Sequence, residues 1–353
     1  MQRTLRNILI SRTDKLGDVV LTLPLLPILK KHFPEARLTM LLSSYTAELA
    51  EGNHHLDKIL LYDREGRPRP FAELVTVIRD AGFDASFVVR PTLRVALLVN
   101  IAGIPIRVGT GYRWYSLLFN RRIYEHRKTA EKHEVEYNLG LLRAVGIDAG
   151  NECIEFSVTI PPEAERRIRS LRTALGIEET DRVVVLHPGS RGSARDWGAS
   201  RFRELANRLS AISGMKVIVT GGKGEQTLVE EVSGPPAPNR IPLANQLTLK
   251  EFAALVRSAD VFVANSTGPL HIAAVVGVPV VGLYPNLTVA SPRRWGPYTE
   301  KKRIFVAKGP LNCRSCLGGS ARPRRGLRPC ECMGTIEVSE VVSAVEELLQ
   351  KSA

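Results

Sequence analysis

A short segment near the N-terminus has residue types and spacing that suit proton transfer. It follows an apolar run and reads Ser11-Arg12-Thr13-Asp14-Lys15-Leu16-Gly17-Asp18. Gly17 allows the chain to turn closely, which places Asp18 in the first turn of the following helix. A carboxylate there can accept a proton from a hydroxyl group. The same position also suits a carboxylate that only caps the helix or offsets its dipole, so both roles are open at this point.

A second segment has the composition of an anion-binding helix start. After an apolar strand the chain reads Asn265-Ser266-Thr267-Gly268-Pro269-Leu270-His271. Pro269 suits the first helical position. Free backbone N–H groups, the Thr267 hydroxyl and the positive end of the helix would form a phosphate site. His271 would lie on the same side of the helix as Thr267. The alternative is a capped helix with a buried histidine.

Two further strand ends in the same half of the chain carry glycine. His187-Pro188-Gly189-Ser190 leads to Arg195, whose guanidinium could bind a phosphate in a forked geometry. Thr220-Gly221-Gly222-Lys223-Gly224 leads to Glu225, which could bind sugar hydroxyls. Together these strand ends predict one rim that holds a nucleotide diphosphate. The first strand-to-helix junction has no G-x-G-x-x-G and the chain has no G-x-x-x-x-G-K-[ST], which disfavours dinucleotide oxidoreductases and P-loop enzymes.

Four of the five cysteines form a cluster. They are spaced as Cys313-x2-Cys316, thirteen intervening residues, and Cys330-x-Cys332. Four thiolates can close a tetrahedral structural zinc site, although Cys-x-Cys is a less usual second half than Cys-x2-Cys. Reduced thiols without a metal are the other interpretation, and a disulfide is disfavoured in the cytoplasm.

The composition is that of a soluble globular protein of two domains. The chain has 353 residues, of which 44% are hydrophobic and 24% charged, and this excludes disordered, collagen-like and coiled-coil classes. The sequence shows neither an apolar run of the roughly 20 residues that span a bilayer nor the apolar core of a secretion signal. We therefore expect a cytoplasmic protein. The net charge of +13 predicts an anionic partner, which could be nucleic acid, a phosphorylated small molecule or an acidic membrane surface.

Short apolar runs alternate with amphipathic stretches twice along the chain, which predicts two doubly wound α/β domains with parallel sheets. We expect domains at residues 1–160 and 161–336, joined through Ile160-Pro161-Pro162, and a C-terminal helix within 337–353 that could pack back across the domain junction. A helix at Glu131–Val145 should stop at Gly146. The predicted strands are Asn7–Ser11, Arg37–Leu42, Lys58–Tyr62, Ala85–Arg90, Arg107–Gly109, Arg182–His187, Lys216–Thr220, Asp260–Ala264 and Val278–Leu283.

Over nearly its whole length the sequence resembles glycosyltransferase family 9, the bacterial heptosyltransferases of the lipopolysaccharide inner core. The resemblance implies a GT-B fold, with two Rossmann-like domains facing each other across a cleft. It also implies inverting, metal-independent transfer from an ADP-heptose donor held by the second domain. Asp18 matches the family's catalytic base and Arg195 its basic phosphate contact. Thr267, Gly268 and His271 match its donor-binding loop, with Ser266 where the family commonly has aspartate. Ser266 and Glu225 complete the donor-binding candidates.

The resemblance also implies an anionic glycolipid acceptor bound by the first domain, at the inner face of the cytoplasmic membrane. Arg94, Arg107 and Arg113 are candidate acceptor contacts. A basic stretch that begins at Lys301 is expected to form a loop, which is either solvated or faces an anion, and Gly318–Pro329 within it is irregular. The candidates for membrane contact in that irregular part are Arg322, Arg324, Arg325 and Arg328. A sugar-nucleotide epimerase and a nucleic-acid binder are the alternatives. No nucleic acid is expected, because only 6% of the residues are aromatic and no aromatic-basic stacking motif stands out.

Overall fold

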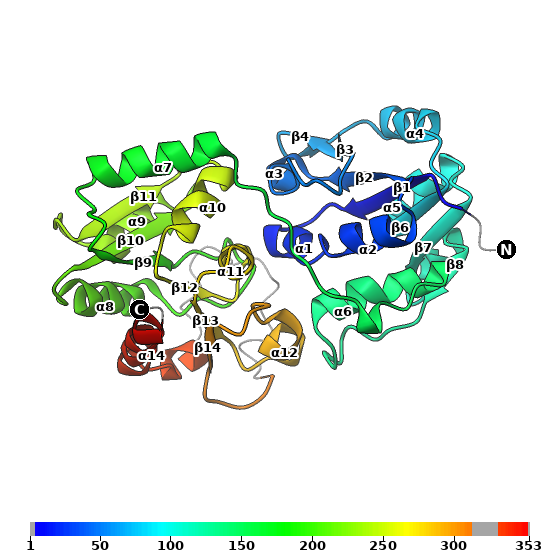
Figure 1. Ribbon diagram of the computed structural model, residues 1–353. Coiled ribbons are helices and arrows are strands. Elements are labelled where there is room, and N and C mark those ends of the chain that lie inside the picture. Colours follow the sequence, from blue (N-terminus) through cyan, green and yellow to red (C-terminus); the bar gives the residue numbers. More distant parts are fainter. Residues whose placement is uncertain (1–3, 313–330, 352–353) are drawn as a thin grey trace. The chain divides into compact units, whose positions relative to one another are not determined.

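The computed structural model describes residues 4–312 and 331–351. The chain divides into two compact units, one of residues 1–127 and 132–159 and the other of residues 128–131 and 160–353. Each unit contains a six-stranded parallel sheet with helices packed on it (Figure 1). The repeated alternation of strand and helix patterns in the sequence therefore predicted the architecture of both units.

The sheet of the first unit has the strand order β3-β2-β1-β6-β7-β8. Its central strands are buried on both faces, as the uninterrupted apolar run Ile8–Ile10 illustrates, and continuous runs of this kind are typical of parallel sheets. The strands are β1 (Asn7–Arg12), β2 (Arg37–Leu42), β3 (Lys58–Leu61), β6 (Ala85–Val88), β7 (Ile106–Thr110) and β8 (Arg121–Ile123), and a separate hairpin pairs β4 (Asp63–Arg64) with β5 (Arg67–Pro68).

Helices cover both faces of this sheet. The predicted helix Glu131–Val145 is instead a short α-helix followed by a 3₁₀ segment, and it stops at Gly146 as predicted, because that glycine adopts a left-handed conformation with φ 82°. The helical segments are α1 (Leu16–Val20), α2 (Leu25–His32), α3 (Ser44–Ala47), α4 (Phe71–Asp80), α5 (Leu93–Ile101), η1 (Trp114–Leu118), α6 (Glu134–Leu139), η2 (Gly140–Val145) and η3 (Ala149–Asn151).

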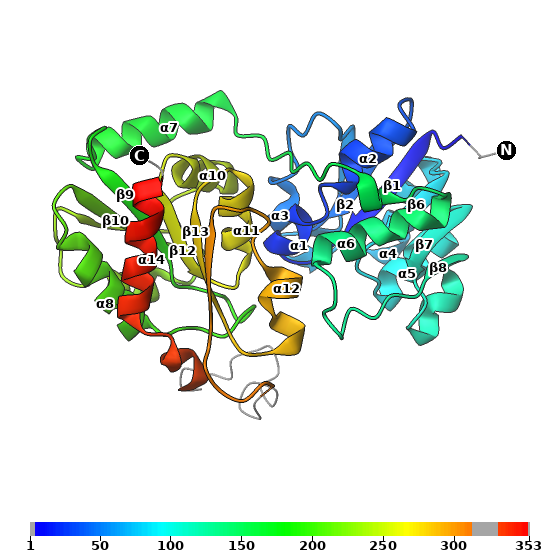
Figure 2. The ribbon, with the colours of Figure 1, turned by 60° about the horizontal axis from the view of Figure 1, so that its bottom comes forward.

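The sheet of the second unit has the order β11-β10-β9-β12-β13-β14. Its strands are β9 (Arg182–His187), β10 (Met215–Gly221), β11 (Arg240–Ala244), β12 (Val261–Asn265), β13 (Val280–Tyr284) and β14 (Lys302–Val306). Its helical segments are α7 (Pro162–Ala174), α8 (Ala199–Ser210), α9 (Gln226–Ser233), α10 (Leu249–Arg257), α11 (Gly268–Val275), η4 (Thr288–Ala290), α12 (Pro292–Trp295), η5 (Glu331–Thr335) and α14 (Val338–Lys351). Helix α14 packs against α8, β12 and β13 (Figure 2).

Three outer strands were not predicted from the sequence, namely β8, β11 and β14. Each lies at the edge of its sheet, where a strand is half exposed and its pattern is less apolar. The expectation that the basic stretch from Lys301 is a loop is wrong at its start, because Lys302 and Arg303 belong to β14. Two of its basic side chains pair with α14, since Arg303 lies 2.9 Å from Glu347 and Lys308 3.1 Å from Glu340.

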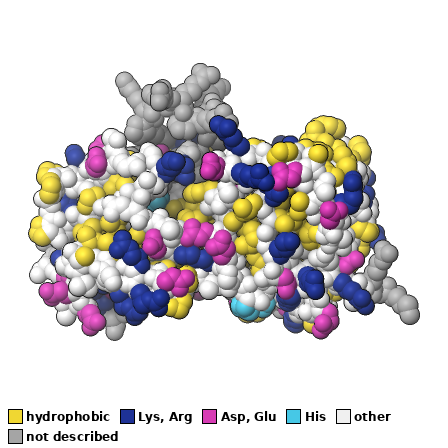
Figure 3. Space-filling model, turned by 90° about the horizontal axis from the view of Figure 1, so that it is seen from above, with side chains coloured by type: hydrophobic (Ala, Val, Ile, Leu, Met, Phe, Trp, Pro, Cys, Tyr) yellow, Lys and Arg dark blue, Asp and Glu magenta, His cyan; other side chains and the backbone are white. Residues whose placement is uncertain are grey.

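The surface charge is mixed rather than segregated on the face shown in Figure 3, where Lys and Arg side chains lie among Asp and Glu side chains on both units. None of the helices within residues 4–312 and 331–351 is long and apolar enough to span a bilayer.

Candidate active site

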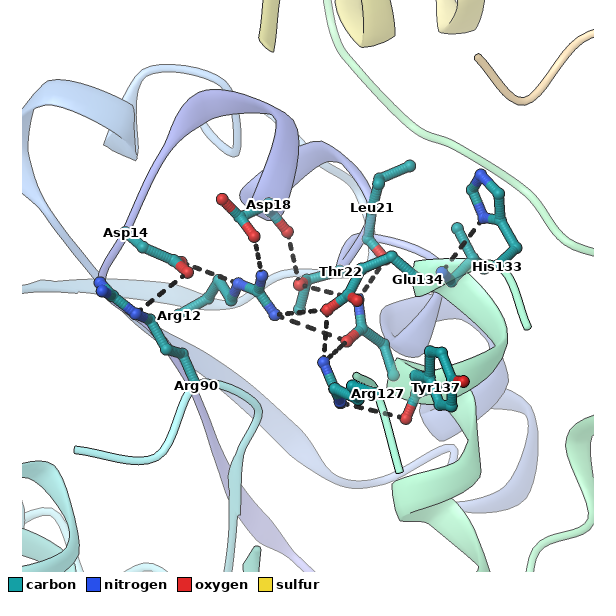
Figure 4. A network of polar contacts seen from close by, with 12 residues as sticks. Arg12, Asp14, Asp18, Leu21, Thr22, Arg90, Arg127, His133, Glu134 and Tyr137 are labelled. Carbon is teal, nitrogen blue, oxygen red and sulfur yellow. Dashed lines mark hydrogen bonds and ion pairs between the residues drawn. The ribbon is translucent and has the colours of Figure 1, made fainter. Parts of the chain in front are cut away.

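The first group of candidate residues lies where β1 ends and α1 begins (Figure 4). Asp18 is the third residue of α1, and the helix begins after Lys15 without a side-chain cap. The Asp18 carboxylate accepts from Nη2 of Arg12, while its backbone oxygen accepts from the Thr22 hydroxyl at 2.7 Å. Asp18 therefore does not cap the helix, but it lies in the first turn, where its charge also offsets the helix dipole. Its role as a base stays a prediction.

Arg12 is the centre of a buried polar network. Only 2% of this residue is exposed. Its Nε donates to Asp14 Oδ1 at 2.8 Å, and its Nη1 lies 3.7 Å from Glu134 Oε1 and 3.5 Å from Asn138 Oδ1. Burial lowers the pKa of Arg12, but the charges of Asp14, Asp18 and Glu134 outweigh this and raise it above its ordinary value. The guanidinium is thus permanently charged and fixed by partners on several sides.

Helix α6 contributes two further side chains to this network. Glu134, its first residue, is 1% exposed and also pairs with Arg127, while Asn138 Nδ2 donates to the Leu21 carbonyl at 2.8 Å. Sequence reasoning missed both Glu134 and Asn138. A signal was present, because His133 and Glu136 form a capping box that fixes the start of α6 and would have identified Glu134 as a helix-start carboxylate.

Asp14 has an unusual environment for a carboxyl group. Burial raises its pKa to about 6, with a further contribution from Asp18, whereas Arg12 and Arg90 act in the opposite direction. Arg90 follows β6, its side chain is half exposed, and its Nε lies 3.4 Å from Asp14 Oδ2. The Asp18 side chain is 16% exposed, compared with 9% for Asp14 and 3% for Arg12. Of these three side chains, Asp18 is therefore the most open to solvent.

The second group lies at the carboxyl ends of β10, β9 and β12, which are neighbours in the sheet of the second unit. The side chain of His187 contacts the Thr220 hydroxyl at 2.9 Å, and Asn265 Nδ2 donates to the Pro188 carbonyl at 2.8 Å. Glu225 accepts from the backbone N–H of Gly222 at 2.7 Å. The structure thus brings together the three strand ends that sequence analysis grouped.

Gly189 is a position where a side chain would not fit as the site stands. A Cβ atom there would lie 2.1 Å from the nearer carboxylate oxygen of Glu225. The Glu225 carboxylate therefore packs directly against the loop that follows β9. Burial lowers the pKa of His187 to about 4, although the charge of Glu225 opposes this, so the imidazole is neutral at physiological pH.

Helix α11 begins at Gly268, so Pro269 is its second residue and not the first as predicted. Thr267 precedes the helix and is 4% exposed, and its hydroxyl has no hydrogen-bond partner among the described residues. A buried hydroxyl without a partner is uncommon in folded proteins and is a reason to look for a ligand. Ser266 donates its backbone N–H to Leu283 at 3.0 Å, and His271 is buried within α11.

The remaining predicted site residues lie in different surroundings. Arg195 is half-buried in the loop between β9 and α8. Arg94 donates to a backbone carbonyl and lies over the Tyr62 ring, 5.8 Å from its centroid. Arg107 donates to the carbonyls of Leu118 at 2.9 Å and Ile104 at 2.6 Å. Arg113 is exposed. The acceptor-binding role of the three first-unit arginines stays a prediction.

Most of the cysteine cluster and all four loop arginines lie outside the described residues. These are Cys313, Cys316, Cys330, Arg322, Arg324, Arg325 and Arg328. Cys332 is described and is half-buried in η5. The structural zinc site and the membrane contact of the four arginines stay predictions.

The sequence matches the model of glycosyltransferase family 9 (heptosyltransferase) over residues 71–321. A Haemophilus influenzae protein named "Putative glycosyltransferase" is 30% identical, with 84% of this chain and 87% of the relative covered. Lipopolysaccharide heptosyltransferase 3 of Escherichia coli is 25% identical over 95% of this chain and 97% of the relative.

Solved structures agree in fold. The family 9 glycosyltransferase of Veillonella parvula has a TM-score of 0.83 at 22% identity, with 99% of each chain covered. The Escherichia coli ADP-heptose heptosyltransferase II has a TM-score of 0.78 at 19% identity, with 99% of this chain and 100% of that chain covered. The fold class is therefore the GT-B type that the sequence predicted. These matches favour sugar transfer over the epimerase and nucleic-acid-binding alternatives, and the chain belongs to glycosyltransferase family 9.

Proposed function

We propose that this glycosyltransferase moves a heptose from ADP-heptose onto a saccharide of the lipopolysaccharide core, with inversion at the anomeric carbon. The observation that carries the proposal is the Asp18 carboxylate, which lies at the carboxyl edge of the first sheet and is oriented by Arg12. The descriptions of the family and of its relatives supply the donor and the acceptor class.

In the proposed reaction an acceptor hydroxyl attacks the anomeric carbon of the donor heptose. A new glycosidic C–O bond forms as the bond between the anomeric carbon and the diphosphate oxygen breaks. ADP leaves with the electron pair, and the proton of the hydroxyl passes to the Asp18 carboxylate. Arg12 acts as a positioning residue, because its guanidinium is buried and held by Asp14, Glu134 and Asn138. A carboxylate fixed in this way loses little rotational freedom on reaching its reactive geometry.

The donor diphosphate would bind at the start of α11. The Thr267 hydroxyl is buried there without a hydrogen-bond partner among the residues that the structure describes, and the first N–H groups of the helix are suited to anions. Arg195 would add a positive charge, and together these groups would stabilise the charge that develops on the leaving diphosphate. We assign Glu225, Ser266, Gly268 and His271 to donor binding as well.

We further propose that the acceptor is an anionic glycolipid and that the enzyme acts as a peripheral protein at the inner face of the cytoplasmic membrane. Arg94, Arg107 and Arg113 would contact acidic groups of the acceptor. Arg113 is exposed, which leaves its guanidinium accessible to a ligand.

Replacement of the proposed base tests the catalytic assignment. Asp18→Asn should leave the melting temperature nearly unchanged, because the amide oxygen can still accept from Arg12 and Arg12 keeps Asp14 and Glu134 as charged partners. Loss of a general base typically lowers the rate by about 10²–10⁴-fold. Asp80→Asn, at the exposed end of α4, removes the same charge and should transfer heptose normally. NMR of the product should show the inverted anomeric configuration. Near-normal turnover of Asp18→Asn would refute the assignment.

Two threonines provide a matched test of the donor site. Thr267→Val removes a hydroxyl without a partner, so it should not destabilise the fold, but it should weaken ADP binding about tenfold in calorimetry. Thr220→Val removes a hydroxyl that bonds to His187 and to the Leu186 carbonyl, so it should lower the melting temperature. Arg195→Ala should weaken the binding of ADP and the binding of ADP-heptose to a similar extent. Unchanged ADP affinity in Thr267→Val and Arg195→Ala would place the diphosphate elsewhere.

A further inference from the structure

The 3₁₀ helix η1 carries large apolar side chains on its outer face. A 3₁₀ helix has three residues per turn, so Trp114 and Leu117 lie on the same side. Trp114 is 75% exposed and Leu117 is 66% exposed. Tyr115 and Leu118, on the other side, pack against the core of the first unit. The core therefore accounts for Tyr115 and Leu118 but leaves Trp114 and Leu117 in solvent.

Two tyrosines extend this apolar surface. Tyr112 precedes η1 and is 45% exposed, and Tyr124 follows β8 and is 61% exposed. Their rings meet edge to face, with centroids 5.6 Å apart. The backbone N–H of Gly111 donates to the Ile123 carbonyl at 2.9 Å, which holds the two segments together. We call Tyr112, Trp114, Leu117 and Tyr124 the aromatic patch. Exposed apolar groups gathered in this way mark interaction surfaces more often than isolated ones do.

The chain around the aromatic patch is strongly basic. Residues 107–127 contain five arginines and a single acid, Glu125. Glu125 is already paired with Lys132, at 2.9 Å, and with Arg143. Arg113 and Arg122 are exposed, and neither forms an ion pair with any residue of the described ranges. The patch is thus bordered by positive charge that no described carboxylate neutralises.

The aromatic patch begins at the edge of the sheet that carries the proposed base. Tyr112 follows the carboxyl end of β7, Arg90 follows that of β6, and Asp18 follows that of β1. These strands are parallel and adjacent in the order β1-β6-β7, so their carboxyl ends lie along one edge of the first unit.

We propose that the aromatic patch, with Arg113 and Arg122, is the surface by which the first unit docks onto an anionic lipid bilayer. Trp and Tyr side chains favour the headgroup region, where the ring is partly in the apolar layer and its polar atom is hydrated. Basic side chains beside them are attracted to anionic headgroups. Apolar insertion and charge attraction together distinguish this surface from a purely electrostatic one. The inference rests on the proposed function, because docking there would bring a lipid-anchored acceptor to the edge that carries Asp18.

Sedimentation with vesicles tests the docking surface. The wild-type protein should bind vesicles of phosphatidylglycerol and phosphatidylethanolamine but not vesicles of phosphatidylcholine. Trp114→Ala/Leu117→Ala should weaken this binding by at least about tenfold, because the two substitutions remove apolar surface that the wild type would bury in the bilayer. Arg113→Gln/Arg122→Gln should also weaken it. The matched control is Leu61→Ala/Ile101→Ala, which removes exposed apolar side chains elsewhere in the first unit and should bind as wild type does.

Tryptophan fluorescence gives an independent measurement. Of the three tryptophans, Trp114 is largely exposed, Trp295 is half-buried in α12 of the second unit, and Trp197 is fully buried. Insertion of the aromatic patch should therefore shift the emission to shorter wavelength through Trp114. The shift should be absent in Trp114→Phe and in phosphatidylcholine vesicles. Because Trp114 and Leu117 project into solvent, the melting temperatures of Trp114→Ala/Leu117→Ala and Trp114→Phe should match that of the wild type.

Three results would overturn the docking proposal. These are no binding of the wild type to anionic vesicles, equal binding of Trp114→Ala/Leu117→Ala and wild type, and an equal loss of binding in the Leu61→Ala/Ile101→Ala control. None of them bears on the proposed sugar transfer, which is judged separately by heptose transfer to a delipidated, water-soluble acceptor. The first result would also refute the proposed membrane association of the enzyme. Conversely, vesicle binding through the patch together with no transfer to that acceptor would refute the proposed function and retain the docking surface.

Discussion

The buried charges around Arg12 make a strong prediction for the stability of the first unit. Arg12→Met removes the guanidinium but leaves Asp14 and Glu134, whose side chains are 9% and 1% exposed, without their shared cation. Removing one partner of a buried ion pair typically costs about 3–5 kcal/mol, because the remaining charge stays desolvated. A domain of this size loses about 2–4 °C per kcal/mol, so the melting temperature of the first unit should fall by about 6–20 °C.

Further substitutions show whether buried charge is the cause. In Arg12→Met/Asp14→Asn/Glu134→Gln the stranded carboxylates become neutral amides, and the triple variant should regain most of the lost stability. Arg90→Gln is the matched control, since this arginine also contacts Asp14 but is half exposed, and it should cost less than about 1 kcal/mol. Thermal unfolding, followed by circular dichroism near neutral pH, measures all of them. The reasoning is refuted if Arg12→Met has the same melting temperature as the Arg90→Gln control, or if the triple variant has a lower melting temperature than Arg12→Met.

Three more predictions concern pH and packing. The pKa of Asp14 is about 6 in the folded state and 3.8 when unperturbed, so on raising the pH the unfolded chain loses this proton first. The free energy of unfolding should therefore fall as the pH rises from 3.8 to 6, and urea unfolding should show a smaller fall for Asp14→Asn. The pKa of His187 is about 4 rather than 6.5, so stability falls as the pH drops from 6.5 to 4, and His187→Gln should reduce that loss in the same assay. In Gly109→Ala the new Cβ would lie 2.6 Å from the buried Phe119 ring, and calorimetry should show a loss of about 1–3 kcal/mol, whereas an unchanged melting temperature would mean that the ring moves freely.

The central elements of both sheets could be predicted from the sequence because their burial on two faces leaves a continuous apolar run. Arg182–His187 was predicted to its last residue, as was Arg37–Leu42. The edge strand Lys302–Val306 could not be predicted in this way, because its first residues are basic and only the ladder with β13 makes them extended. Secondary structure that depends on a distant partner leaves little local pattern.

The same distinction between local patterns and distant partners applies to the candidate site. Residues in contiguous motifs, such as Asp18 and Thr267, could be found because each follows a predicted strand and opens a helix. The contacts of Glu134 and Asn138 with Arg12 could not be predicted, because each spans more than a hundred residues of sequence, although the helix start marked Glu134 as a carboxylate of interest. Arg12 itself is visible in the motif, yet only the fold shows that its guanidinium lies among three carboxylates.

The sequence separation within the Arg12 network has a consequence for synthesis on the ribosome. Arg12 and Asn138 are 126 residues apart, so β1 leaves the ribosome long before α6 exists. At about 5–20 residues per second, the chain spends several seconds with Arg12 exposed to non-native partners. Contacts of such long range also slow folding, because the intervening chain must be ordered before they form. The part of the first unit that orients the proposed base should therefore be among the last to gain protection against hydrogen exchange during refolding.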